Sequence, residues 1–229
     1  MKHESANGII LRRINYGEAD RIITFLTAEF GKIRAIAKGV RKQKSKMAGG
    51  IELFSVSELQ FIKGKGDIDT LMSTRLIKHY GNVVKDLERT QLAYDFLKII
   101  DKTVEDTAGN EYFMVLHESI AALDNVNLPI TLSEMSFDMR VLQLLGQVPN
   151  FGVDSLGNPL DELAQYEFDF ESVSFVASPS GQFNKNHLKV LRLMAHNSPQ
   201  SMASVQGIGR LVDELKPMVR NLFSYYAPQ

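Results

Sequence analysis

The hydrophobic period of the sequence changes near residue 80, and this change limits the possible folds more than any other feature. Before it, short segments rich in β-branched and aromatic residues alternate with turn signals such as NYGEA, AEFG and KGKGD. In KIRAIA, the residues Ile33, Ala35 and Ala37 share one face, which is the period-2 pattern of a half-buried strand. The predicted strands cover residues 7–14, 20–27, 32–39, 55–62 and 69–76. Five strands in so short a stretch predict a small barrel of the OB type.

After residue 80 the apolar residues recur at helical spacing. Three stripes run through residues 92–104, 113–123 and 137–145, and two more run through residues 188–194 and 211–222. Residues 149–184 between them are rich in Pro and Gly and predict a loop-rich insert. The predicted fold class is therefore α+β multidomain, with an OB-type β-barrel domain over residues 1–80 and a helical domain over residues 81–229.

The net charge of −1 hides an asymmetry between these two parts. Residues 1–80 hold 15 Lys+Arg against 8 Asp+Glu, a net of +7, and the remaining residues hold 11 against 19, a net of −8. A basic part joined to an acidic part indicates a polyanionic partner for the basic part only.

The positive charge is densest in AKGVRKQKSKMAGG, residues 37–50, directly after the KIRAIA strand. Crowded cations repel one another unless solvent or a polyanion relieves the repulsion. Single-stranded nucleic acid is held by such cations together with aromatic side chains on which bases stack. A solvated surface loop is the alternative. The same part of the chain supplies five aromatic residues, some of which must fill the barrel: Tyr16, Phe25, Phe30, Phe54 and Phe61.

The sequence contains no recognisable catalytic motif. It has no P-loop and no GxSxG elbow, and its five histidines show neither HExxH nor a short paired spacing. Cysteine is absent, which excludes disulfides, thiol nucleophiles and cysteine-based zinc sites. We therefore expect a protein that is not an enzyme and that needs no cofactor or metal. No membrane-length apolar stretch and no signal-peptide core are present, so a cytoplasmic location without membrane contact is expected.

The N-terminal part resembles the RecO family of recombination mediators. The resemblance is carried by YGEADRIITFLTAEFGKIRAIAKGVRKQKSK, by GGIELFSVSEL and, in the helical part, by LLGQVP. It implies an OB domain followed by a helical domain, in a nucleoid-associated protein of DNA repair. It further implies binding to single- and double-stranded DNA, annealing of strands coated with single-strand binding protein, and recombinase loading with a RecR-type partner.

One departure from the family concerns a zinc site that many members build from two CxxC pairs. Aligning the glycines that follow those pairs with Gly157 and Gly181 puts Val153, Leu156, Ala177 and Ser180 at the ligand positions, and none of these binds Zn²⁺. We expect a degenerate, zinc-less insert in which a small hydrophobic contact of Val153 and Leu156 replaces the metal.

The predicted phosphate contacts lie on and beside the basic run. They are Arg34, Lys38, Arg41, Lys42, Lys44 and Lys46, with Arg21 and Lys32 as neighbours.

A second cluster lies in the acidic part, where Lys185, Lys189 and Arg192 share one face of a predicted helix. Beside Leu188 and Leu191, this face suits an acidic, partly apolar peptide such as the C-terminal tail of single-strand binding protein. A solvated helix face is the simpler alternative. Two other functions stay open: a protein-interaction scaffold and an RNA-binding OB protein without mediator activity, since nothing in the sequence must read a 2′-hydroxyl.

Overall fold

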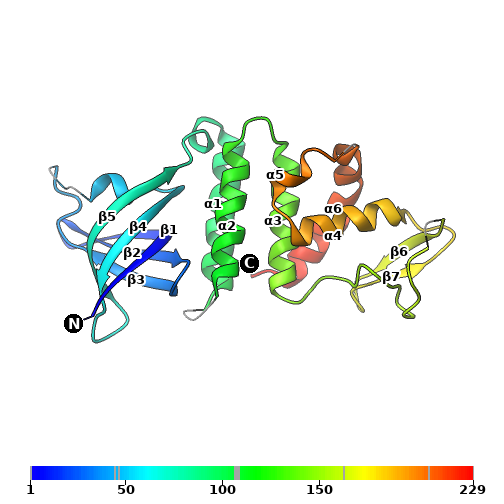
Figure 1. The fold of residues 1–229 in the computed structure, drawn as a ribbon, viewed down its shortest axis with the longest axis horizontal. Helices are drawn as coiled ribbons and strands as arrows, with labels where there is room; N and C mark the ends of the chain where they lie inside the picture. The colour runs from blue at the N-terminus through cyan, green and yellow to red at the C-terminus, as the bar shows by residue number, and fades with distance from the viewer. Residues whose placement is uncertain are drawn as a thin grey trace. The chain divides into compact units, whose positions relative to one another are not determined.

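The computed structural model describes residues 2–43, 45, 47–105, 109–161, 163–205 and 207–228 (Figure 1). The chain forms two compact units, Met1–Asn125 and Val126–Gln229. The predicted division after residue 80 separates strands from helices, whereas the contacts group the next two helices with the strands. The domain boundary at residue 80 stays a prediction.

The first unit begins with five strands whose pairing returns to its starting point. They are β1 (His3–Tyr16), β2 (Asp20–Thr27), β3 (Gly31–Ala37), β4 (Ser55–Ile62) and β5 (Asp69–His79). Their order is β1-β2-β3-β5-β4, and β4 pairs with β1 to close the barrel. All neighbours are antiparallel except β3 and β5. The predicted five-stranded architecture is confirmed.

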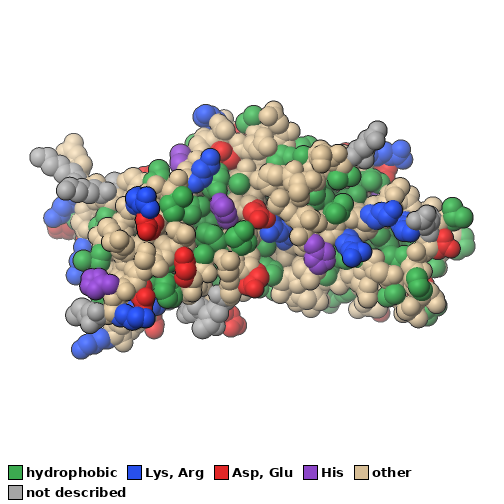
Figure 2. All heavy atoms as spheres, in the orientation of Figure 1, with side chains coloured by type: hydrophobic (Ala, Val, Ile, Leu, Met, Phe, Trp, Pro, Cys, Tyr) green, Lys and Arg blue, Asp and Glu red, His purple; other side chains and the backbone are tan. Residues whose placement is uncertain are grey.

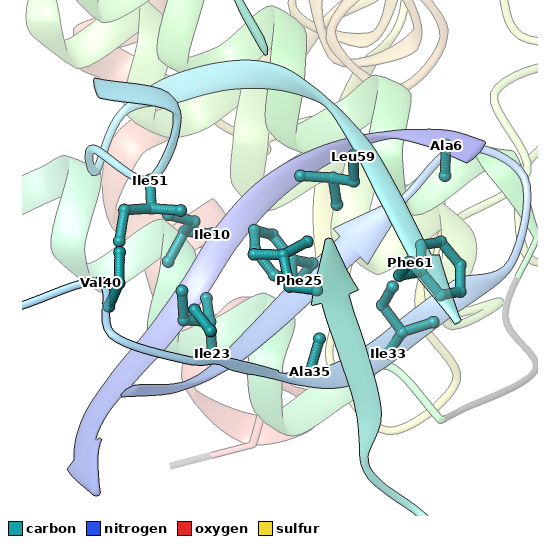
Figure 3. Packing of buried hydrophobic residues seen from close by; sticks show 12 residues of the cluster. Ala6, Ile10, Ile23, Phe25, Ile33, Ala35, Val40, Ile51, Leu59 and Phe61 are labelled. Carbon is teal, nitrogen blue, oxygen red and sulfur yellow. The ribbon is translucent and has the colours of Figure 1, made fainter. Parts of the chain in front are cut away.

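The barrel encloses a core of side chains that alternate along the strands, with Phe25 near its centre (Figure 3). Ile33, Ala35 and Ala37 are buried as the alternation predicted. Residues outside the strands complete this core. Val40 lies within the basic run and Ile51 follows it directly, and both belong to the cluster. Met47, between these two residues, packs against the same core, just before a short helical turn η1 (Ala48–Gly50).

Two helices cover one side of the barrel. A helical turn η2 (Val83–Lys85) leads into α1 (Leu87–Thr103) and α2 (Asn110–Asp124), which lie side by side (Figure 1). Ile9 and Leu26 pair across β1 and β2 and alternate with residues of the barrel core, yet both are fully buried. Their burial follows because α1 packs against β1 and α2 against β2.

The second unit contains the remaining helices, α3 (Ile130–Leu144), α4 (Lys185–His196), α5 (Pro199–Met202) and α6 (Ile208–Tyr226). The apolar stripes predicted from the period lie in the core, where Phe137, Leu191 and Leu215 are buried. Gly207 adopts a left-handed conformation, φ 75°, immediately before α6, as a turn at a helix start requires. None of the described helices has the length and apolar character needed to cross a membrane.

The predicted loop-rich insert contains a small sheet that the sequence pattern did not reveal. Strands β6 (Gln165–Asp169), β7 (Ser174–Ala177) and β8 (Phe183–Asn184) pair in the order β7-β6-β8. Aromatic rings fill its core: Phe175 lies 5.1 Å from Phe168 and 6.0 Å from Phe183, measured between ring centres. These edge-to-face contacts stabilise the insert beyond the area they bury.

The predicted hydrophobic contact between Val153 and Leu156 is wrong, because the Leu156 side chain is 84% exposed. Asp154 forms a tight turn at this point. Its Oδ1 accepts hydrogen bonds from the backbone N–H groups of Leu156 and Asn158, both at 2.9 Å. These bonds keep the pKa of Asp154 below its usual value, with the backbone bond from Asn158 as the largest cause.

Candidate nucleic-acid interface

The described cations of the basic run lie in the turn that follows β3. We call residues 38–43 the basic turn, and residues 17–19, between β1 and β2, the first turn. Lys38, Arg41 and Lys42 are exposed in the basic turn, while Val40 between them is buried in the barrel core. Lys44 and Lys46, which the sequence also predicted as phosphate contacts, lie outside the described residues.

The basic turn is bonded to the first turn and to the start of β2. The N–H of Gly39 donates to Oδ1 of Asp20 at 2.7 Å, and the N–H of Arg41 donates to the carbonyl of Ala19 at 2.9 Å. The guanidinium of Arg41 also donates to the carbonyl of Gly17 at 3.3 Å. Three positive side chains are thus presented to solvent from a fixed backbone, an arrangement suited to binding an extended polyanion.

Arg21 and Arg34 lie on the neighbouring strands. Arg21 follows Asp20 on β2, is half-buried, and donates from Nε to Oδ1 of Asn15 at 3.2 Å. Arg34 is exposed on the outer face of β3, on the side away from Ile33 and Ala35. Since residues along a strand rise by about 3.3 Å each, Arg34 lies roughly 13 Å along the chain from Lys38.

Lys32 differs from the other predicted phosphate contacts. Its side chain is only 12% exposed, and Nζ donates a hydrogen bond to the carbonyl oxygen of Asp101 at 2.8 Å. Nζ also lies 3.7 Å from the Asp101 carboxylate, and Nε of Arg12 lies 3.7 Å from the same group. The structure therefore places Lys32 at the end of α1 rather than with the exposed cations.

Most of the aromatic residues considered for base stacking fill the core. Phe25, Phe54 and Phe61 are fully buried and Phe30 is partly buried. Tyr16 is the exception, because it is 54% exposed at the end of β1, next to the first turn. One aromatic side chain is thus available beside the basic turn.

The helices restrict which part of the barrel is open to a ligand. OB barrels bind nucleic acid through the face of strands 2 and 3 and through the loops that join strands 1–2 and 4–5. Here Thr24 and Leu26 of β2 are buried, as α1 and α2 cover that side. On the face drawn in Figure 2, acidic and hydrophobic side chains lie between the basic ones. The turns at the barrel's ends carry exposed cations, among them Lys38, Arg41 and Lys42.

Sequence reasoning missed the basic residues of the loop between β4 and β5. Lys63 and Lys65 are exposed there, in KGKGD, which was interpreted only as a turn signal. Two lysines spaced by glycines in a loop between strands were the available signal.

The second predicted cluster lies on α4. Lys189 and Arg192 are exposed and Lys185 is half-buried, as a shared helix face requires. The predicted apolar neighbours are wrong, because Leu188 and Leu191 belong to the buried core. A groove of about 460 Å³ instead joins Lys185 and Lys189 to Leu163 of the insert, which is 93% exposed.

Within the described ranges, no group of three or more His, Asp or Glu side chains is placed to hold a metal ion.

Comparisons with known proteins agree with the resemblance drawn from the sequence. Residues 1–80 match the family model described as recombination protein O N terminal. The chain is 27% identical to a DNA repair protein RecO of an Exiguobacterium species, over 97% of this chain and 89% of the relative. It is 28% identical to the RecO protein of Acetivibrio thermocellus over 94% and 88% of the two chains. Over a shorter stretch, 62% of this chain and 55% of the relative, it is 34% identical to the RecO protein of Dehalococcoides mccartyi.

Proposed function

We propose that this chain, a relative of the RecO proteins over nearly its whole length, is a DNA-binding recombination mediator in DNA repair. It binds single-stranded DNA, anneals complementary strands, and helps to load the recombinase onto DNA coated with single-strand binding protein. The observation that carries the DNA contact is the basic turn, whose exposed cations project from a backbone fixed by the first turn.

Lys38, Arg41 and Lys42 bind phosphates in this proposal, with Arg21 and Arg34 beside them. Lys44 and Lys46 of the same run contribute further charge. Contacts of this kind carry no sequence information, so the basic turn itself binds DNA of any sequence. Binding through phosphates also leaves the base edges free to pair, which annealing of two strands requires. The chemistry is binding and remodelling, without bond-making.

The cluster on α4 serves the second role of a mediator, recognition of a protein on the DNA. Lys185, Lys189 and Arg192 supply positive charge, and Leu163 across the groove supplies an exposed apolar side chain. An acidic, partly apolar peptide such as the tail of single-strand binding protein matches both features. A RecR-type protein is the expected second partner.

Two triple variants with the same loss of charge test this division of roles. Replacing Lys38, Arg41 and Lys42 by Ala removes three phosphate contacts, so the slope of log K against log salt for single-stranded DNA falls by about 2, at about 0.7 per contact. Binding of the tail peptide stays unchanged. Replacing Lys185, Lys189 and Arg192 by Ala gives the reverse result. Equal loss of DNA binding in both variants contradicts the assignment of DNA to the basic turn.

Annealing of complementary strands coated with single-strand binding protein tests the function as a whole. The wild type accelerates annealing. The first triple variant is slower because it binds DNA more weakly, and the second because it binds the tail peptide more weakly. A chain that binds the tail peptide but neither binds nor anneals DNA is a protein-interaction scaffold. If RNA displaces bound DNA at a far lower concentration than competitor DNA of equal length, the chain is an RNA-binding protein.

A further inference from the structure

A cleft of about 210 Å³ lies at another part of the barrel from the basic turn. It opens between the start of β3 and the loop that joins β4 to β5, residues 63–68. The side chains that line it include Phe30, Arg34, Lys63 and Asp67. This loop is one of the two through which OB barrels bind oligonucleotides, and none of the proposed phosphate contacts lies on it. Arg34, which lies beside those contacts on β3, also lines the cleft.

The floor of the cleft is aromatic and its charged neighbours are paired. Phe30 packs edge-to-face on Phe61 with 5.7 Å between ring centres, and Nζ of Lys63 lies 5.4 Å from the centre of the Phe30 ring. Nζ of Lys63 also lies 3.6 Å from Oδ2 of Asp69, whose Oδ1 accepts the N–H of Gly64 at 2.9 Å. Lys63 and Asp69 thus hold the loop and neutralise each other.

Two charged groups at the cleft are left without such partners. Arg34 and Asp67 are both exposed, and neither side chain makes a hydrogen bond or ion pair with another residue that the structure describes. A phosphate attracted by Arg34 is repelled by Asp67, and a simple cation attracted by Asp67 is repelled by Arg34. A ligand that satisfies both groups carries donors and acceptors on one edge.

The size of the cleft narrows the ligand further. Pockets for drug-sized molecules are about 300–1,000 Å³, so this cleft suits a single flat ring. An unpaired nucleobase has the required size, an apolar face for Phe30 and a mixed edge. A carboxylate accepts a hydrogen bond from the exocyclic amine of cytosine, and arginine donates to base acceptors.

We propose that this cleft binds one unpaired nucleobase of the DNA strand, preferring a base with an exocyclic amine. This inference rests on the proposed function, since it assumes that the chain binds single-stranded DNA. Duplex DNA has its base edges occupied by pairing and does not enter. The cleft therefore adds a preference for single strands to the phosphate contacts, which do not distinguish bases.

Loss of the Asp67 carboxylate separates base recognition from simple charge effects, because the two predict opposite changes in DNA affinity. If only phosphates bind near the cleft, Asp67→Ala strengthens binding of every strand by removing a negative charge. If a base binds, Asp67→Ala weakens binding of oligo-dC by about 5-fold or more. The Asp67 side chain is exposed and makes no hydrogen bond or ion pair within the described residues, so the variant keeps the fold. Glu18→Ala, an exposed carboxylate of the first turn, is the matched control and strengthens all strands equally.

The probes are oligo-dC, oligo-dT and an abasic strand of the same length, titrated by fluorescence anisotropy at slightly alkaline pH. The expected order for the wild type is oligo-dC tighter than oligo-dT and both tighter than the abasic strand, with oligo-dC losing its lead in Asp67→Ala. Equal, salt-dependent affinities for all three strands overturn the cleft inference and leave the phosphate contacts standing. Failure to bind any of the strands overturns the proposed function itself.

Discussion

The ammonium of Lys32 donates a hydrogen bond to the backbone carbonyl oxygen of Asp101, with 2.8 Å between the two atoms. Asp101 lies in the last turn of α1, where carbonyl groups lack partners within the helix and partial negative charge accumulates. A positive side chain from β3 therefore caps α1 and joins the helix to the barrel.

Replacing Lys32 by Met keeps the apolar stem and removes this charge-assisted bond. The free energy of unfolding should fall by about 1.5–3 kcal/mol, the usual range for a hydrogen bond to a charged group. The salt dependence of DNA binding should not change, because Lys32 does not face a phosphate. Urea denaturation and a salt titration measure the two quantities.

Lys38→Met is the control for this variant, because Lys38 is exposed in the basic turn. It should lower the salt slope by about 0.7 on single-stranded DNA and leave stability within about 0.5 kcal/mol of the wild type. A reduced slope in Lys32→Met would restore Lys32 to the phosphate contacts.

Tyr16→Ala should weaken binding of single-stranded DNA by about 1–3 kcal/mol, since Tyr16 is the exposed aromatic beside the basic turn and stacking contributes that much per base. Duplex binding should change little, because paired bases are not free to stack on a side chain. Tyr225→Ala, at an even more exposed tyrosine near the end of α6, serves as the control and should affect neither substrate. Equal losses on single strands and duplex would assign Tyr16 a structural role.

Asp138→Asn should make stability less dependent on pH. Asp138 is buried in α3, and burial, followed by repulsion from Glu134, raises its pKa well above the usual value despite Arg220 and Lys216 nearby. The folded state therefore holds a proton that the unfolded state releases at about pH 4. The resulting stability is complete below that pH and is lost as the pH rises toward the raised pKa. Chemical denaturation at several pH values should show the Asn variant gaining on the wild type as the pH increases, and a constant difference would contradict the burial argument.

Asn184→Ala should destabilise α4 by about 0.5–2 kcal/mol. The Asn184 side chain accepts the N–H of Asn186 at 2.9 Å, and Nδ1 of His187 accepts the N–H of Asn184 at 3.1 Å. Each of the two side chains thus satisfies a backbone donor at the start of the helix. Asn186→Ala removes an exposed side chain from the same turn and should have little effect. Thermal unfolding of both variants gives the comparison, and equal losses would show that the cap contributes nothing.

The strands and most helices could be predicted because alternation and helical period record which faces are buried. Ile33, Ala35 and Ala37 follow this rule directly. The period also decided between two interpretations of Leu188 and Leu191, which lie in the core as their stripe indicated. The sequence period does not show which residues far apart in the chain become neighbours in the fold.

Lys32 and Arg34 show the limit most clearly. They are of one charge class, two positions apart on one strand face, and the sequence treats them alike. Of these two residues, Asp101, 69 residues away, contacts Lys32 and not Arg34. The small sheet of the insert escaped prediction for a related reason, because strands of five, four and two residues are too short to show a period.

Val40, within the basic run, and Ile51, directly after it, both belong to the barrel core. The cations next to Val40 therefore depend on the folded core for their positions, so on the proposed function DNA binding and folding of the barrel are thermodynamically linked. A ligand that binds only the folded form stabilises it by about 2.7 kcal/mol at a hundredfold excess over its dissociation constant. The melting temperature of the barrel should therefore rise with the concentration of DNA, and the DNA-free protein is the less stable form.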